Sequence, residues 1–133
     1  MEVFLTNEYI KGAGMNKHVY FIVSVKINDG KLDAFKNIAQ AMIAATQNEP
    51  GALAYEWYFS ADQARCRLVE TYVDDNAVQA HIGGKAVTEF VPKLLQVSGI
   101  SSFEVYGDTG SKAAEMLKGI GAELFQPWDG LHR

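Results

Sequence analysis

Two segments rich in aromatic and β-branched residues, 52–59 (ALAYEWYF) and 65–73 (RCRLVETYV), are separated by only five residues. So short a connection predicts an antiparallel hairpin. Residues 18–27 (HVYFIVSVKI) have a similar composition and predict a further strand. Between 31 and 48, apolar residues recur at helical spacing and predict one amphipathic helix. A strand, a helix and a hairpin in this order favour an α+β architecture.

The second half of the chain continues the alternation of helix and strand. Short polar residues at 74–76 can cap a helix, because their side-chain oxygens accept hydrogen bonds from free amide groups. The glycine pair at 83–84 predicts a break, after which the helix is expected to resume over 85–97. Pro92 should kink this second part or mark a fresh start.

A fourth strand is predicted at 99–107, a short helix at 111–120 and a short edge strand at 122–128. The order is that of the ferredoxin-like, split strand-helix-strand fold with an antiparallel sheet. We expect one such domain over residues 17–133, with the last helix and strand as C-terminal additions. Residues 1–16 are expected to be an extension ahead of it.

The composition is that of an ordinary globular domain, with 48% hydrophobic and 21% charged residues. A net charge of -4 without a basic stripe argues against a nucleic-acid partner. The sequence shows neither a secretory signal nor an apolar stretch of transmembrane length, so we expect a cytoplasmic protein that does not bind membranes. Cys66 is the only cysteine, which rules out an intramolecular disulfide.

Both faces of the predicted sheet carry apolar or aromatic side chains. In the first strand, Phe21 lies on one face, whereas Tyr20 and Ile22 lie on the other. Two or so helices can cover only one face. A second copy of the sheet would cover the other, so we expect a homodimer. The alternative is an open sheet whose tyrosines face water.

The strand that ends in Glu70 and Tyr72 leads directly into the helix that carries His81. Glu70 and Tyr72 share one face, and a helix that folds back over the sheet brings His81 roughly level with Glu70. A half-buried histidine beside a carboxylate could act as a base near neutral pH. A satisfied core histidine is the alternative. Apolarity favours Val69 and Val73 as the helix-facing set, which would send Glu70 to the dimer interface.

Aromatic side chains near this point could line a pocket for a flat organic ligand, although core packing would explain them equally well. The candidates are Phe21, Tyr55, Trp57, Tyr58 and Tyr72. The three histidines show no metal-ligand spacing, so we expect no metal site. Neither a dinucleotide fingerprint nor a nucleophile elbow occurs.

Three stretches, NEPGALAYEWY, LVETYVDDNAVQAHI and KAVTEFVPKL, together resemble the antibiotic biosynthesis monooxygenase family of dimeric α+β barrels. The resemblance runs from about residue 18 to 106. The pattern E-x-Y-x-D-x-x-A-x-x-x-H, at residues 70–81, is most similar to the quinol monooxygenase and phosphorylated-autoinducer isomerase branch. The haem-degrading branch uses an Asn, Trp, His set, from which this chain departs, with Tyr72 where the tryptophan would be expected.

The resemblance implies oxygenation of a small quinol or polyphenol-like aromatic by dioxygen, without a metal, flavin or nicotinamide cofactor. It implies His81 as base or proton shuttle, Glu70 as its orienter and Tyr72 as a hydrogen-bond donor or pocket wall. The aromatic residues 55 and 57 would line the substrate pocket. An isomerase of a small hydroxyketone that uses the same acid-base pair is one alternative. A non-catalytic dimer that binds a small ligand is the other.

Overall fold

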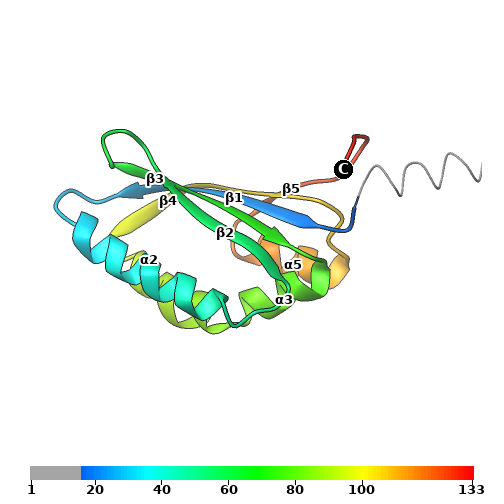
Figure 1. The fold of residues 1–133 in the computed structure, drawn as a ribbon, viewed down its shortest axis with the longest axis horizontal. Helices are drawn as coiled ribbons and strands as arrows, with labels where there is room; N and C mark the ends of the chain where they lie inside the picture. The colour runs from blue at the N-terminus through cyan, green and yellow to red at the C-terminus, as the bar shows by residue number, and fades with distance from the viewer. Residues whose placement is uncertain (1–15) are drawn as a thin grey trace, which may run out of the picture.

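The structure of the protein is a computed structural model that describes residues 16–133; most of the expected N-terminal extension lies outside the described residues. One five-stranded sheet forms a layer, and the helices form a second layer against one of its faces (Figure 1). The strands are β1 (Val19–Ile27), β2 (Ala52–Phe59), β3 (Arg65–Tyr72), β4 (Ser98–Tyr106) and β5 (Glu123–Phe125). The helices are α2 (Leu32–Thr46), α3 (Asp75–Ile82), the π-helical turn η1 (Ala86–Phe90), α4 (Val91–Leu94) and α5 (Ser111–Gly119).

The strands lie in the order β2-β3-β1-β4-β5 across the sheet. β1 pairs antiparallel with β3 and β4, and β2 pairs antiparallel with β3, whereas β5 runs parallel to β4. This confirms the predicted ferredoxin-like α+β fold. The predicted edge strand is shorter than expected and ends before Pro127, which has no amide hydrogen to donate to a ladder.

The predicted break after α3 is also present. The chain passes through the π-helical turn η1 before α4 begins at Val91. Pro92 lies in the first turn of α4. The amide of Val91 still donates to the carbonyl of Val87 in η1, so the helical backbone continues, and Pro92 lies where the π-helical turn gives way to α4. Within residues 16–133, each helix is too short or too polar to cross a membrane.

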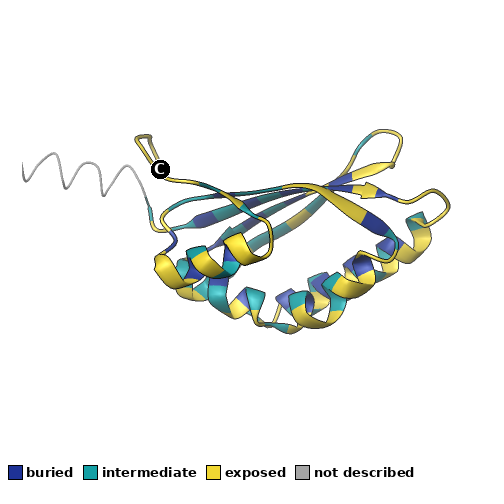
Figure 2. Cartoon of the chain, turned by 180° about the vertical axis from the view of Figure 1, so that it is seen from behind, coloured by how far each residue is buried: buried dark blue, intermediate teal, exposed yellow. Residues whose placement is uncertain are grey.

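The core lies between the sheet and the helical layer, and Figure 2 shows buried positions along the strands and helices. β1 supplies a fully alternating apolar face. Its buried members are Val19, Phe21, Val23, Val25 and Ile27. α2 packs against this face with buried residues at helical spacing, namely Phe35, Ala39, Met42 and Thr46.

The pairing of β3 with β1 decides which face of β3 looks toward the helices. Directly opposite residues on paired strands point to the same side of the sheet, and Phe21 lies opposite Glu70. Glu70 and Tyr72 are therefore buried under the helices. Val69 lies opposite Ile22 on the open face, contrary to what its apolarity favoured, and Val73 lies beyond the end of β3.

Gly51 lies where the chain enters β2 beneath α3. A Cβ atom placed on Gly51 would lie 2.5 Å from the Cβ atom of Ala77, so only glycine permits this approach. The carbonyl of Gly51 also accepts a 2.9 Å hydrogen bond from the amide of Val73, just after β3. Gly51 thus joins β2, β3 and α3 at one point.

We expect Gly51→Ala to lower the free energy of unfolding by about 1–3 kcal/mol, because overpacking forces α3 away from the sheet. Urea denaturation followed by circular dichroism measures this change. Gly119→Ala is the matched control, because a Cβ atom at Gly119 meets nothing within 4 Å. Equal stability of the two variants would contradict a tight contact between Gly51 and Ala77.

Candidate active site

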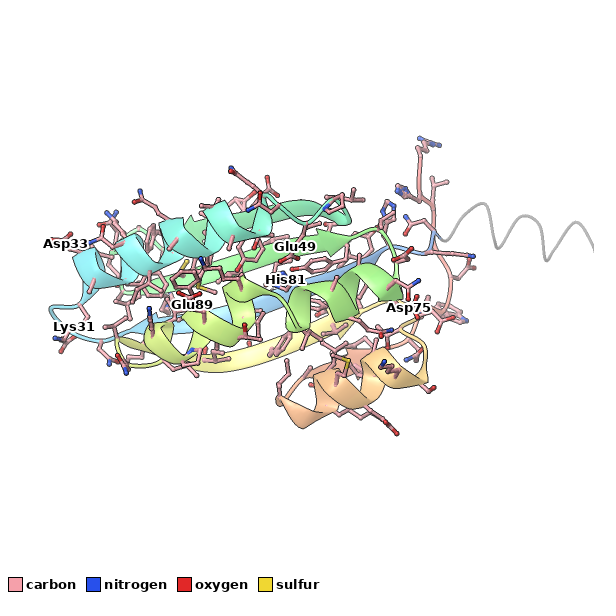
Figure 3. The ribbon with its side chains drawn as sticks, turned by 90° about the horizontal axis from the view of Figure 1, so that it is seen from below. Lys31, Asp33, Glu49, Asp75, His81 and Glu89 are labelled. Atoms are coloured by element: carbon pink, nitrogen blue, oxygen red, sulfur yellow. The ribbon has the colours of Figure 1, made fainter. Side chains whose placement is uncertain are left out.

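Three parts of the chain bring polar side chains together inside the core. β3 contributes Glu70 and Tyr72, α3 contributes His81, and the connection between α2 and β2 contributes Glu49. Figure 3 views the helical layer and labels Glu49 and His81 between α2 and α3. Glu70 and His81 are 3% exposed, so the centre of this polar cluster is shielded from water.

Local sequence fixes the direction of α3. The side chain of Asp74 accepts a 2.9 Å hydrogen bond from the amide of Ala77, so Asp74 is the N-cap, as the polar residues at 74–76 predicted. The helix then returns over the sheet with Val78 and His81 as its buried residues. The capped turn therefore places the imidazole beside the strand that precedes it.

The imidazole of His81 lies between two carboxyl groups. Its Nδ1 atom is 2.9 Å from Oε1 of Glu49, and its Nε2 atom is 3.6 Å from Oε1 of Glu70. Tyr72 donates a 2.5 Å hydrogen bond from its hydroxyl to the same Oε1 of Glu70. The rings of Tyr72 and Tyr55 pack against the imidazole, with centroid distances of 4.9 and 5.4 Å.

Burial controls the charge of this cluster. It raises the pKa of Glu70 to about 8, with a smaller contribution from the charge of Glu49, although the hydrogen bond from Tyr72 opposes the rise. Burial also lowers the pKa of His81, which the charge and hydrogen bond of Glu49 partly offset. Near neutral pH, Glu70 is therefore mainly a neutral acid and His81 a neutral imidazole.

The pKa values of the Tyr55 and Tyr72 phenols are also raised. The main cause is burial away from water, and the nearby charge of Glu70 is the second cause. The phenols of Tyr55 and Tyr72 consequently stay protonated and can act as hydrogen-bond donors.

Cys66 lies in the same core, and burial raises the pKa of its thiol to about 11. That thiol is not a thiolate at neutral pH, which is consistent with an inert core cysteine.

A cavity of about 280 Å³ lies between the sheet and the helical layer, beside this cluster. Its wall is largely apolar, and Tyr55, Glu70 and His81 supply its polar side chains. The apolar wall includes Phe21, Val23, Met42, Leu68, Leu94 and Phe103. A mainly apolar cavity with a few polar groups at one side is typical of a small-molecule site.

The structure brings most of the predicted site residues to this cavity. Phe21 and Tyr55 line it beside the acid-base pair, and Tyr72 lies behind Glu70. Trp57 does not line the cavity but packs edge-on against Tyr55, which does. Its indole Nε1 is buried without a hydrogen-bond partner among the described residues.

Tyr58 does not join this group. It lies opposite Arg67 in the β2-β3 ladder, on the open face of the sheet, and is 50% exposed. Trp57 lies opposite the buried Leu68 instead. Because neighbouring strand residues point to opposite faces, Trp57 and Tyr58 cannot both face one cavity.

The sequence reasoning missed Glu49. It follows α2 and precedes Pro50, in a connection where no periodic pattern assigns a side-chain direction. Its backbone is held by two turn hydrogen bonds, from its amide to the carbonyl of Thr46 (2.9 Å) and from the amide of Ala52 to its carbonyl (3.1 Å). The only available signal was its position beside a Pro-Gly turn that leads into the candidate strand.

No three His, Cys, Asp and Glu side chains within residues 16–133 are grouped so as to hold a metal ion. Glu49 and Glu70 each contact His81 instead. The arrangement therefore provides a neutral base, a neutral acid and two phenols at the edge of an apolar cavity. Such a set can take a proton from a bound molecule and return it.

Solved structures share this fold. MupZ from Pseudomonas fluorescens has a TM-score of 0.78 at 22% identity, covering 89% of this chain and 96% of that protein. A conserved protein from Methanosarcina mazei Go1 has a TM-score of 0.63 at 17% identity, over 75% and 98%. A structure described as antibiotic biosynthesis monooxygenase has a TM-score of 0.58 at 19% identity, over 65% and 92%. A search among curated proteins gave no match.

The sequence itself matches a family model. The model is described as antibiotic biosynthesis monooxygenase and matches residues 18–93, which is more than half of the chain. The match includes the first six elements, from β1 to η1, and with them the acid-base cluster. The chain belongs to the antibiotic biosynthesis monooxygenase family.

Proposed function

We propose that the protein is a cofactor-independent monooxygenase that oxidises a small quinol or polyphenol-like aromatic with dioxygen. The observation that carries the proposal is the imidazole of His81, beside Glu70 at the polar edge of an apolar cavity lined by Phe21 and Phe103. The family match supports a monooxygenase in general. The substrate class rests on the cavity and on the resemblance of residues 70–81 to the quinol monooxygenase branch.

In the proposed reaction, an aromatic ring lies against the apolar wall with one hydroxyl group at His81. Nε2 of His81 takes the hydroxyl proton and leaves a phenolate. The apolar surroundings exclude water from this anion, and the walls hold the ring in place. A phenolate is much more electron-rich than the parent phenol, so deprotonation prepares the substrate for dioxygen.

The remaining steps belong to the substrate and dioxygen. The phenolate transfers one electron to dioxygen, and the two radicals combine into a peroxide through a new carbon-oxygen bond. That carbon then loses its proton as the O–O bond breaks, so one oxygen atom remains as a carbonyl and the other leaves as water. The substrate supplies every electron that dioxygen accepts, and no separate reductant is required.

Glu70 is proposed as the acid of the pair. Because it is protonated near neutral pH and stands 3.6 Å from Nε2, it can stabilise the peroxide or return a proton to the leaving oxygen. Tyr72 holds the carboxyl in position through its hydrogen bond. Tyr55 is proposed as a second donor toward the substrate oxygen.

Oxygen uptake with a panel of hydroquinones tests the proposal. We expect the purified protein to consume dioxygen, and His81→Ala to lower kcat/KM by roughly 100-fold or more, because the base is removed. His132→Ala is the matched control, since His132 is exposed and lies outside the cavity. Absence of uptake above background, or equal rates for His81→Ala and wild type, would contradict the proposal.

A second candidate, an isomerase of a small hydroxyketone, is favoured by the juxtaposition of a neutral acid and a neutral base. Glu70 and His81 could move a proton between adjacent carbon atoms of a substrate without oxidation. Only the isomerase would convert its substrate under nitrogen. Anaerobic incubation of hydroxyketones followed by product analysis therefore separates the two activities.

The proposed acid requires Glu70 to be protonated in the folded protein. Its folded pKa of about 8 lies above the ordinary value of 4.5, so the folded state keeps a proton that the unfolded chain loses between these values. The stability contributed by neutral Glu70 is fully present below about pH 4.5 and is lost as the pH rises through about 8.

We expect Glu70→Gln to gain stability relative to wild type, on the order of a few kcal/mol, as the pH rises from about 5 to about 9. Glutamine keeps an oxygen that can accept from Tyr72 but carries no charge. Urea denaturation across this range measures the difference, with the exposed Glu115→Gln as control. A constant difference between Glu70→Gln and wild type would show that Glu70 is already ionised when buried.

We also propose that the protein is a homodimer in which a second copy covers the open face of the sheet. The support is chemical: this face presents the half-buried Tyr20, Ile22 and Val69, together with the exposed Tyr58. An apolar sheet face of this kind is usually buried against another layer. The helices occupy only the opposite face in the described part of the chain (Figure 1).

We expect sedimentation analysis to give a dimer at micromolar concentration, and Ile22→Asp at the middle of the open face to give a folded monomer. A buried charge at the centre of an interface is costly, whereas the same charge on an open sheet is not. Glu115→Lys on the outer surface of α5 is the control. A wild-type protein that sediments as a monomer would refute the dimer.

A further inference from the structure

Glu49 makes the closer of the two carboxyl contacts of His81. Its Oε1 is 2.9 Å from Nδ1, which is hydrogen-bond distance, whereas Glu70 lies 3.6 Å from Nε2. A carboxylate can only accept, so this contact requires hydrogen on Nδ1. The neutral imidazole then has its lone pair on Nε2, which is the atom on the side of Glu70.

The fold makes room for the second oxygen of Glu49. A Cβ atom at Gly84 would lie 2.9 Å from Oε2 of Glu49, so a larger residue there would press on the carboxylate. Gly84 belongs to the break that ends α3, three residues after His81. The helix break therefore provides space for the carboxylate that contacts the helix's own histidine.

Glu49 is also the member of this set that reaches solvent. Its side chain is 16% exposed, compared with 4% for both His81 and Glu70. Its backbone is fixed by the turn hydrogen bonds to Thr46 and Ala52. A carboxylate that is held in place, hydrogen-bonded to a buried imidazole and partly open to water can pass protons between the two.

We infer that Glu49 is the positioning residue of His81, and that it carries protons between the buried imidazole and solvent. By accepting from Nδ1–H, it holds the imidazole with Nε2 free toward Glu70 and the cavity. The inference rests on the proposed function only for its catalytic consequence. It also gives Glu49 the orienting role that the family resemblance implied for Glu70.

The proton moves in two balanced steps. When Nε2 takes a proton from the substrate hydroxyl, the imidazole becomes an imidazolium with hydrogen on both nitrogens. The Nδ1 proton then passes to the carboxylate of Glu49 and from there to water, and His81 returns to neutrality with its hydrogen on Nε2. In the second step that hydrogen returns to the leaving oxygen, Glu49 takes one proton back from water and passes it to Nδ1, and the starting tautomer is restored.

Nuclear magnetic resonance of ¹⁵N-labelled histidine in the free protein tests the positioning role without any substrate. We expect wild-type His81 to show the Nδ1–H tautomer, and Glu49→Ala to lose its dominance because Nδ1 has no acceptor. Glu89→Gln is the matched control, since Glu89 is an exposed glutamate whose contacts are to Lys85 and Lys93. An unchanged tautomer in Glu49→Ala would overturn the inference.

The titration of His81 gives a second readout. The titratable groups that face its ring are Glu49, Glu70, Tyr55 and Tyr72. Because the charge of Glu49 raises the pKa of His81, we expect Glu49→Gln to lower that pKa further. Glutamine keeps an acceptor oxygen at nearly the same place, so this variant remains informative if Glu49→Ala does not fold. A titration identical to that of Glu89→Gln would also overturn the inference.

Steady-state kinetics of quinol oxidation give a third test. With a quinol that the wild-type protein oxidises, we expect Glu49→Ala to lower kcat/KM on the order of 10- to 100-fold with little change in KM. We expect Glu49→Asp, which keeps a carboxylate, to recover part of the lost kcat/KM. Equal kcat/KM for Glu49→Ala and Glu89→Gln would contradict the proton-transfer role. If no quinol is oxidised, the proposed function fails, while the tautomer and titration still decide the placement of Glu49.

Discussion

The pairing of Phe21 with Glu70 is the contact on which the rest of the site depends. β1 has one strongly apolar face, and the helices must cover it to bury Phe21 and its alternating neighbours. Since opposite residues share a face, the same force carries Glu70 and Tyr72 into the core. Burial of a carboxyl group then follows from hydrophobic packing elsewhere in the sheet. The raised pKa of Glu70 is thus a product of the fold as a whole.

A buried polar cluster is tolerable only when its members satisfy one another. Tyr72 donates to Glu70, Glu49 accepts from His81, and the two aromatic rings enclose the imidazole. The cluster also limits its charge, because burial keeps Glu70 protonated and His81 neutral near pH 7. The same features that make the cluster acceptable inside a core make it suitable for moving protons. A single charge, on Glu49, lies at the edge where water can solvate it.

Sequence periodicity predicted the elements of the fold because each relies on local pattern: alternation in β1, the apolar stripe of α2 and the polar cap of α3. Periodicity could not show which face of β3 looks toward the helices, because the apolar Val69 suits the core better than Glu70. The pairing of β3 with β1 determines that Glu70 faces the helices. The assignment of Tyr58 to the pocket ignored strand alternation beside Trp57. Glu49 was beyond reach because its contact with His81 spans 32 positions and depends on a loop with no periodic signal.

The location of the β2-β3 turn has a consequence for how such a chain can vary. Residues 60–64 lie at the end of the hairpin remote from Glu70 and Tyr72, so changes in the length of this turn leave the cluster intact. A single residue inserted within β3 would have a different effect, because every later side chain in the strand would then point to the opposite face of the sheet. Glu70 and Tyr72 would then face outward, and Val69 and Thr71 would replace them under the helices. The chemistry of this protein is therefore tolerant of changes in the length of the β2-β3 turn and intolerant of changes in the length of β3.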